Sequence, residues 1–325
     1  MRVVAVIFGG TSLEHEVSCV SGREVLEHLD RSRYRALPVL IEAGGSWVVD
    51  GERREGPLEG VAALREASCD VCFLALHGPF GEGGTLQALL ETAGLPFTGS
   101  GMVGSALALD KIRAKRLLRS YGVEGAPDRT VPGASLREIA EALGFPCVVK
   151  DPHQGSTLGL RMAADALELA RAIDELGRDC ETLLVERREA GREITASILD
   201  DGDGEPQCLP LVEIRARNGF FDYDEKYGAD GARKIVPAPL DERTAAALRE
   251  CALLVHRVLG LRQMSRSDFI LRPQGDFVFL ETNTIPGLTP TSLLPKAAAA
   301  VGMSFGQVVT RLIEGALTHR FSAVR

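Results

Sequence analysis

The chain has 325 residues, of which 45% are hydrophobic and 25% are charged, so it can form two or three domains with buried cores. The formal net charge of -8 argues against nonspecific nucleic-acid binding, and no apolar run is long enough to span a membrane. Since the first residues lead into an apolar strand without a signal peptide, we expect a cytoplasmic protein with no nucleic-acid or membrane partner.

Seven cysteines are scattered along the chain, and only Cys69 and Cys72 form a CxxC motif. A zinc site or a redox pair is the alternative interpretation, but no second pair accompanies this motif. The motif opens an apolar strand, which favours buried, reduced thiols and a reducing compartment.

Arginine outnumbers lysine 31 to 6, so arginine is the default cation of this chain. A lysine that persists can mark a place where a compact point charge is needed, such as a phosphate site. The six lysines are Lys111, Lys115, Lys150, Lys226, Lys234 and Lys296.

The first hundred residues alternate between strand and helix patterns, which predicts an open α/β unit. Strands are expected at residues 2–8, 34–41, 71–76 and 96–98, and helices at residues 14–29, 58–66 and 83–93. His77 follows the third of these strands, where α/β sheets place ligand-binding groups; a structural cap is the alternative.

The next segment carries three of the lysines. A helix is expected at residues 105–121 with Lys111 and Lys115 one turn apart, although such a pair can also lie on a solvated face. A helix at 136–143 precedes a strand at 146–150 that ends in Lys150. The small-residue loop at 154–159 could close over phosphates with its amides, and it is not a P-loop. A helix at 164–176 and a strand at 182–186 follow.

Antiparallel strands are expected at residues 192–199 and 208–214, and helices at 242–259 and 304–317. Between the second of these strands and the first of these helices, residues 218–234 are polar and rich in Gly and Asp, with four aromatic side chains. A loop of this length is often functional. We expect it to become ordered over the site when ligands bind.

A predicted hairpin at residues 265–271 and 276–282 carries the strongest chemical signal. If Leu271 pairs with Asp276, then Arg266 lies opposite Glu281, and strand alternation puts Arg266, Asp268, Glu281 and Asn283 on one face. Carboxylate and carboxamide oxygens suit Mg²⁺ together with substrate phosphates. The alternative is an exposed polar sheet face. In the turn that follows, Gly287 would let backbone amides approach a ligand.

These features together resemble the D-alanine–D-alanine ligase family of the ATP-grasp superfamily. The matching segments, in order, are residues 9–18 (GGTSLEHEVS), 76–78 (LHG), 81–87 (GEGGTLQ), 98–101 (TGSG), 110–111 (DK), 223–227 (YDEKY) and 281–289 (ETNTIPGLT).

The resemblance implies α/β and α+β architecture in three domains: an N-terminal α/β domain at 1–100, a central ATP-grasp lid at 101–185 and a C-terminal catalytic domain at 186–325. It implies a homodimer that joins two D-alanines with ATP for peptidoglycan synthesis. The cofactors would be ATP and two Mg²⁺ ions, which Mn²⁺ could replace. The first carboxylate would attack the γ-phosphate, and the amine of the second D-alanine would attack the acyl phosphate.

The resemblance also implies roles for individual residues. Asp268, Glu281 and Asn283 would bind metal. Arg266 and the Gly287 amide would stabilise the oxyanion, and Glu14, Ser156 and Tyr227 would form a triad closing the site. Substrate contacts would come from Glu14, His77, Arg266, Gly287, Ser292 and Leu293. Nucleotide contacts would come from Lys111, Lys150, Ser156, Glu186, Arg187, Glu189, Glu193 and Lys226.

Two places depart from the family pattern. The loop after Lys150 reads Asp151-Pro152-His153-Gln154-Gly155-Ser156, where the family usually has Pro-Ser-x-Glu-Gly-Ser. The adenine linker reads Glu186-Arg187-Arg188-Glu189, in which the planar guanidinium of Arg188 could stack on the base.

Two rival functions stay open. One is ligation of another D-amino or D-hydroxy acid; by the resemblance, Tyr227 favours an amine nucleophile. The other is a catalytically weak paralogue that binds nucleotide as a regulatory or scaffold protein. The combination of Lys111, Lys150, Arg266, Asp268, Glu281 and Asn283 argues against the paralogue.

Overall fold

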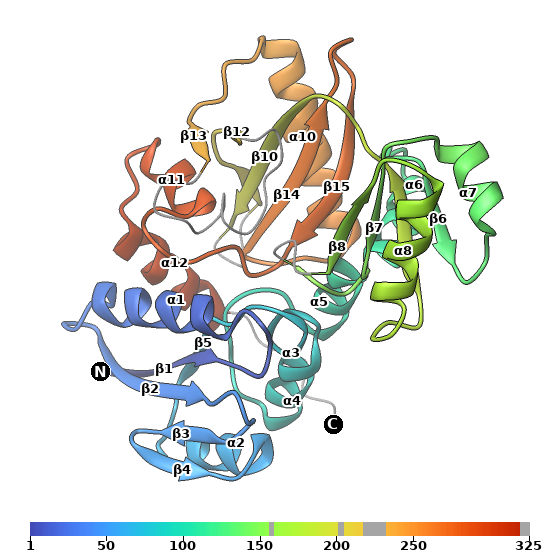
Figure 1. The fold of residues 1–325 in the computed structure, drawn as a ribbon. Coiled ribbons are helices and arrows are strands. Elements are labelled where there is room, and N and C mark those ends of the chain that lie inside the picture. The colour runs from blue at the N-terminus through green and yellow to red at the C-terminus, as the bar shows by residue number, and fades with distance from the viewer. Residues whose placement is uncertain (156–158, 201–204, 217–231, 319–325) are drawn as a thin grey trace.

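A computed structural model describes residues 1–155, 159–200, 205–216 and 232–318. Its strands form three sheets, which build an N-terminal α/β domain, a central domain and a C-terminal α+β domain (Figure 1). No helix in the described ranges is long and apolar enough to cross a membrane. The fold class is therefore the predicted one.

The N-terminal sheet has the order β4-β3-β2-β1-β5, with β1 parallel to both β2 and β5. The apolar run of β1 is buried on both faces, as expected for a central parallel strand. The elements are β1 (Arg2–Gly9), α1 (His15–His28), β2 (Tyr34–Ile41), β3 (Trp47–Val49), β4 (Glu52–Arg54), α2 (Pro57–Glu66), β5 (Val71–Leu74), α3 (Pro79–Glu82) and α4 (Thr85–Ala93).

The central sheet is antiparallel, with the order β6-β9-β7-β8. Two short helices connect it to the N-terminal sheet, and two further helices cover it (Figure 1). The elements are α5 (Met102–Leu109), α6 (Lys111–Arg119), β6 (Asp128–Val131), α7 (Leu136–Leu143), β7 (Cys147–Lys150), β8 (Leu160–Ala163), α8 (Ala166–Leu176) and β9 (Leu183–Arg187).

The C-terminal sheet is also antiparallel, with the order β13-β12-β10-β14-β15 and β11 paired to β10. One face packs on α10, while the other faces α11 and the central domain (Figure 1). The elements are β10 (Arg192–Leu199), β11 (Gln207–Cys208), β12 (Val212–Arg215), β13 (Arg233–Ile235), α10 (Glu242–Val258), β14 (Met264–Leu271), β15 (Phe277–Asn283), α11 (Leu293–Ala299) and α12 (Phe305–Thr318).

The predicted hairpin forms, but its predicted register is wrong. Leu271 pairs with Phe277, and a β-bulge between Asp268 and Phe269 shifts the pairing again, so Arg266 lies opposite Asn283 and Asp268 opposite Glu281. The register is thus one residue off at the turn and two residues off beyond the bulge. A shift of two keeps side chains on the same face, so the predicted polar face is present.

Several predicted elements have different limits. The helix expected at 105–121 is two helices, because Asp110 ends α5 and caps α6 by accepting a hydrogen bond from the Arg113 amide (2.9 Å). The strand expected at 208–214 is divided into β11 and β12, and the strand expected at 71–76 ends at Leu74. Residues 96–98 form only an isolated bridge between Phe97 and Cys72.

The loop expected at 218–234 lies outside the described residues, except for its last three positions. Of these, Arg233 and Lys234 belong to strand β13. Ordering of this loop on ligand binding stays a prediction.

Buried apolar side chains form three clusters. The first joins the N-terminal sheet to α11, α12 and part of the C-terminal sheet, and the second joins α5 and α6 to α10 and the inner strands of the C-terminal sheet. The third belongs to the central domain alone and consists of Ile139, Leu143, Cys147, Val149, Ala163, Leu169, Ala172, Leu183 and Val185. The domain boundaries after residues 100 and 185 stay a prediction.

Candidate active site

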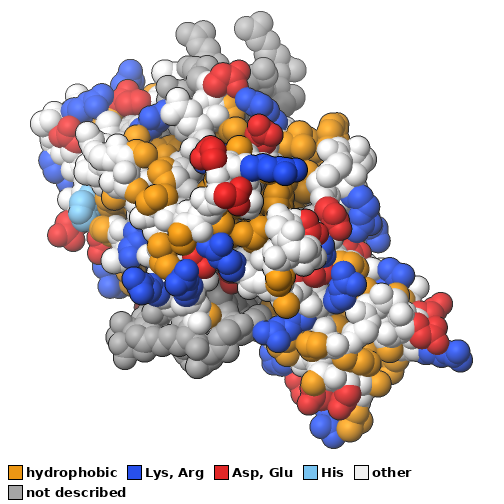
Figure 2. All heavy atoms as spheres, turned by 90° about the horizontal axis from the view of Figure 1, so that it is seen from above, with side chains coloured by type: hydrophobic (Ala, Val, Ile, Leu, Met, Phe, Trp, Pro, Cys, Tyr) orange, Lys and Arg blue, Asp and Glu red, His pale blue; other side chains and the backbone are white. Residues whose placement is uncertain are grey.

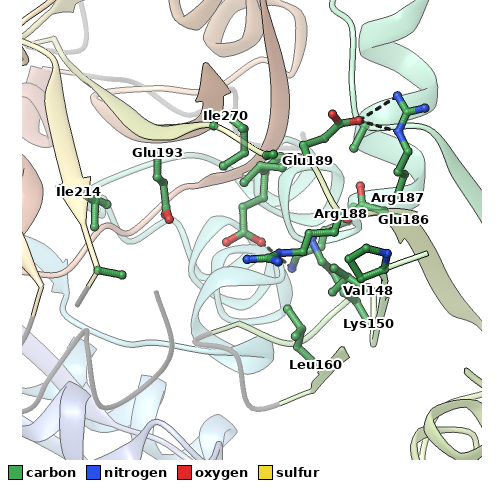
Figure 3. A pocket seen from close by; sticks show the side chains of 18 of the residues that line it. Val148, Lys150, Leu160, Glu186, Arg187, Arg188, Glu189, Glu193, Ile214 and Ile270 are labelled. Atoms are coloured by element: carbon green, nitrogen blue, oxygen red, sulfur yellow. Dashed lines mark hydrogen bonds and ion pairs between the residues drawn. The ribbon is translucent and has the colours of Figure 1, made fainter. Parts of the chain in front are cut away.

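A cavity of about 730 Å³ lies between the central and C-terminal sheets. Lys150, Glu186 and Arg188 lie at one side of it, and Glu193 and Ile214 at the other (Figure 3). This volume is within the range of small-molecule sites. Acidic and basic side chains are interspersed over the molecular face in Figure 2.

All predicted nucleotide-binding residues in the described ranges line this cavity: Lys111, Lys150, Glu186, Arg187, Glu189 and Glu193. Arg188 lines it as well. The carboxylate of Glu189 also forms ion pairs with Arg187 (3.2 Å) and Arg272 (2.8 Å). Ser156 and Lys226 lie outside the described residues.

Glu186 on β9 is 2% exposed and is held between two lysines. Lys150 Nζ lies 2.6 Å from its Oε2, and Lys115 Nζ pairs with its Oε1. Burial would raise the pKa of Glu186, but Lys150 and Lys115 outweigh burial and lower it. Burial would also lower the pKa of Lys150, yet Glu186 and Glu281 leave it raised. Both groups are therefore charged at neutral pH.

Lys115 is buried, so the alternative of a solvated face is wrong for it. Besides Glu186, its Nζ lies 3.0 Å from Asp128 Oδ2 and donates to the Ala126 carbonyl at 2.8 Å. It thereby connects α6 to two strands of the central sheet. In the sequence, Lys115 stands out because lysines are rare in this chain. Its buried partners could not be predicted, because they are distant in the chain.

Lys111, also buried, links the nucleotide cavity to the polar face. Its Nζ lies 3.1 Å from Glu281 Oε2 and donates to the Gln154 carbonyl at 2.9 Å. Its backbone amide donates to the Pro152 carbonyl at 3.2 Å. One residue at the start of α6 thus contacts both the loop after β7 and strand β15.

The predicted metal ligands share one face. Asp268 lies opposite Glu281, and the Arg266 guanidinium makes a forked contact with Asp268 at 3.0 and 2.9 Å. Asn283, opposite Arg266, completes an all-oxygen set. Among the described residues no three His, Cys, Asp or Glu side chains cluster as a metal site. The set has two carboxylates and a carboxamide, which is the kind Mg²⁺ takes when phosphates supply the rest.

Glu14 and His77 mark the amino-terminal side of the site. Glu14 is buried at the start of α1, and a Cβ on Gly155 would come within 3.4 Å of its Oε2. His77 Nε2 lies 3.1 Å from Ser21 Oγ, and burial lowers the pKa of the ring, while Glu14 opposes this shift. The loop after β7 and the N-terminal domain therefore meet at Glu14.

Glu82 was not predicted as a site residue. Its Oε2 accepts a hydrogen bond from the Gly78 amide at 2.8 Å. Burial raises the pKa of Glu82 to about 8, and the nearby Glu14 carboxylate adds to the rise. The sequence feature that could have indicated Glu82 is its isolation, because it is the one charged residue between His77 and Glu91.

The turn after β15 brings the other predicted substrate residues together. A Cβ on Gly287 would lie 2.8 Å from Ser292 Oγ, so no larger residue fits without a shift. The Ser292 hydroxyl lies 2.8 Å from the Thr289 hydroxyl, and Leu293 is buried at the start of α11. Tyr227 lies outside the described residues, so the predicted triad with Glu14 and Ser156 stays a prediction.

Two antiparallel sheets that enclose a cavity lined by lysines and carboxylates define an ATP-grasp ligase. The chain matches the D-ala D-ala ligase N-terminus family over residues 3–60 and 54–100, and the D-ala D-ala ligase C-terminus family over residues 122–314. It is 39% identical over 315 residues to the D-alanine–D-alanine ligase of Syntrophotalea carbinolica, covering 97% of this chain and 96% of that protein.

Solved structures agree with the sequence match. The D-alanine–D-alanine ligase from Bacillus anthracis complexed with ATP superposes with a TM-score of 0.80 at 29% identity, covering 98% of both chains. The VanG D-Ala:D-Ser ligase from Enterococcus faecalis gives 0.81 at 31% identity, covering 97% of this chain and 99% of that one. The chain belongs to the D-alanine–D-alanine ligase family. Its activity is ATP-dependent ligation of two D-alanines for peptidoglycan synthesis.

Lys115→Met should lower the free energy of unfolding by about 3–5 kcal/mol, because it leaves the buried Glu186 carboxylate with one fewer cation. Denaturant unfolding measures the change. Arg116→Met, exposed on the same helix, is the control and should change stability by less than about 0.5 kcal/mol. Equal stabilities for the two variants would contradict the role of Lys115.

The raised pKa of Glu82 predicts a pH dependence of stability. The folded protein keeps this proton up to about pH 8, whereas the unfolded chain loses it near the ordinary value of 4.5. Between these values the unfolded state binds fewer protons, so the free energy of unfolding falls as pH rises. Glu82→Gln should remove this fall. Unfolding curves from about pH 5 to pH 8 measure it, with the exposed Glu27→Gln as control; parallel pH profiles for wild type and Glu82→Gln would refute the assignment.

Proposed function

We propose that ATP lies in the cavity with its phosphates directed toward the polar face of β14 and β15. One observation carries this proposal: the Lys111 ammonium contacts both the loop over the cavity and Glu281 on that face. A phosphate chain that reaches Lys111 from the cavity therefore arrives at the carboxylates that suit Mg²⁺. The related structure from Bacillus anthracis contains ATP.

The adenine would lie between apolar side chains of the two sheets. Val148 and Leu160 line the cavity from the central sheet, and Ile270 and Leu280 line it from the C-terminal sheet. Glu186 would face the base and Glu193 the ribose, with Arg187, Arg188 and Glu189 at the linker. Lys150 and Lys111 would hold phosphates, with Lys226 at the γ-phosphate.

Asp268, Glu281 and Asn283 would hold two Mg²⁺ ions, which Mn²⁺ could replace. Arg266 and Lys111 now neutralise the two carboxylates, which supports a site built for positive charge. When bound, the ions would supply positive charge to the transferring phosphate. The residues on this face fit such ions because every donor is an oxygen.

The amino acids would react on the same face. Glu14 would hold the ammonium of the first D-alanine. The carboxylate of that D-alanine would then attack the γ-phosphate and release ADP. The amine of the second D-alanine would then attack the acyl carbon, forming the peptide bond and expelling phosphate. Arg266 and the Gly287 amide would stabilise the oxyanion of that step. Ser292 and Leu293 would bind the second carboxylate, His77 would lie beside Glu14, and Ser156 with Tyr227 would close the site.

The state and location of the protein are also proposals. The family resemblance supports a cytoplasmic homodimer with domain boundaries after residues 100 and 185. All seven cysteines are free thiols, which supports a reducing compartment.

A substrate panel tests the function. Phosphate release and product masses should be followed with ATP, Mg²⁺ and D-alanine alone or with D-serine or D-lactate. We expect D-alanyl-D-alanine as the main product, increasing with pH as the acceptor amine deprotonates. A dominant D-alanyl-D-serine would favour the activity of a D-Ala:D-Ser ligase such as VanG. A dominant ester would make the acceptor a hydroxy acid, and no phosphate release would favour a non-catalytic paralogue.

Glu281→Gln should reduce turnover by orders of magnitude while the protein stays folded, because the variant loses a charged oxygen ligand beside Lys111. Mg²⁺-dependent phosphate release and circular dichroism measure the two effects. Glu250→Gln makes the same change at an exposed position of α10 and should be fully active. Near-normal Mg²⁺-dependent turnover in Glu281→Gln would contradict the assignment of Glu281 as a metal ligand.

A further inference from the structure

Two of the six lysines, Lys234 and Lys296, have no role in the site described so far. Lys234 is on β13, opposite Ile214, which in turn lies opposite Glu193. Residues paired across antiparallel strands share a face. Lys234 therefore lies on the sheet face that carries Glu193, Asp268 and Arg266, not on the face that packs against α10.

The Lys234 side chain reaches the turn that precedes α11. Its Nζ donates to the Thr291 carbonyl at 3.1 Å, next to Ser292. In Figure 1, β13 and α11 lie side by side at the edge of the C-terminal sheet. The ammonium is therefore held at the residues proposed to bind the second amino acid, away from the nucleotide cavity.

Neither Lys234 nor Lys296 has a carboxylate within 4.0 Å among the residues that the structure describes. Lys234 is half-buried. Burial lowers the pKa of Lys234, and Lys296 and Arg266 lower it further. Lys234, Lys296 and Arg266 are thus close enough for their positive charges to repel one another, and the Arg266 guanidinium is paired with Asp268. Such an arrangement is costly unless an anion joins it.

Two buried hydroxyls on the same face also lack a partner. Ser197 lies opposite Arg266 and Thr195 opposite Asp268. Both residues are almost fully buried, and in the described part of the chain neither Oγ of Ser197 nor Oγ1 of Thr195 has a hydrogen-bond partner. A buried polar group without a partner needs a physical explanation, and a polar ligand bound on this face would supply one.

We propose that Lys234, with Lys296 beside it, binds the carboxylate of the acceptor amino acid next to Ser292. This inference rests on the proposed function, because it assigns a specificity residue to the acceptor subsite. A carboxylate offers two oxygens to the ammonium groups and neutralises part of their charge. An acceptor without a carboxylate leaves these lysines unpaired. Lys234 therefore selects amino acids over other small amines.

A competition experiment tests the assignment. Wild type and variants receive ATP, Mg²⁺, D-alanine and D-alaninamide together, and mass spectrometry gives the ratio of D-alanyl-D-alanine to D-alanyl-D-alaninamide. D-alaninamide has no carboxylate to phosphorylate, so it can serve only as acceptor. The ratio reports acceptor selection alone, and neither the fraction of folded enzyme nor its affinity for ATP changes it.

Lys234→Met should lower this ratio about tenfold or more, and Lys234→Arg should retain most of it. The control is Arg233→Met, because Arg233 is the exposed neighbour on the opposite face of β13, and it should leave the ratio unchanged. In separate saturation curves, Lys234→Met should raise the D-alanine concentration for half-maximal dipeptide formation about tenfold and leave that for ATP unchanged.

The outcomes separate the two hypotheses. If wild type forms dipeptide and Lys234→Met has a wild-type product ratio and a wild-type D-alanine requirement, the role of Lys234 is wrong and the proposed function stands. If Lys234→Met raises the requirements for ATP and D-alanine equally, Lys234 has a structural role and the inference also fails. If wild type forms no ligation product, the proposed function itself fails.

Discussion

The site depends on a set of paired charges around the buried Glu186 carboxylate. Inside the central domain, Lys115 of α6 and Lys150 of β7 balance the charges of Asp128 on β6 and Glu186 on β9. The Nζ–O distances are 2.6 Å for Lys150–Glu186 and 3.0 Å for Lys115–Asp128. Removing any member leaves an uncompensated charge in a poorly solvated place. The cavity wall is therefore preorganised, because Lys150 has its position before a nucleotide arrives.

The polar face depends on an irregular feature of the hairpin. On β15, Phe277 pairs with Leu271 and Phe279 pairs with Phe269. Leu271 and Phe269 belong to the apolar core between β14 and α10. With regular pairing from there, Glu281 would lie opposite Ser267 and point into that core. The extra residue at the bulge allows Leu280 and Glu281, although consecutive, both to line the cavity. The bulge thus supplies an apolar contact and an acid from neighbouring positions.

Much of this arrangement could be predicted from the sequence, and the exceptions have physical reasons. Strong periodic runs gave reliable elements, and β2, α7 and β10 have the predicted limits. The short, charged strand β4 could not be recognised, since its sequence lacks an apolar strand pattern and it is held by pairing with β3. The split at Asp110 depends on a capping hydrogen bond within a continuous helical pattern. Glu82 and Lys115 acquire their roles only from burial against residues far away in the chain.

The partition of the apolar side chains into three clusters has a consequence for ligand binding. The central domain has its own small core of nine residues, whereas the other two sheets share larger cores with neighbouring helices. Cooperative units with fewer buried contacts open at a lower free energy than the rest of a protein. We expect amide hydrogen exchange to be faster there than in β1 or β14. A nucleotide that bridges the two sheets must therefore also stabilise the least stable cooperative unit, so part of its intrinsic affinity is converted into local folding free energy.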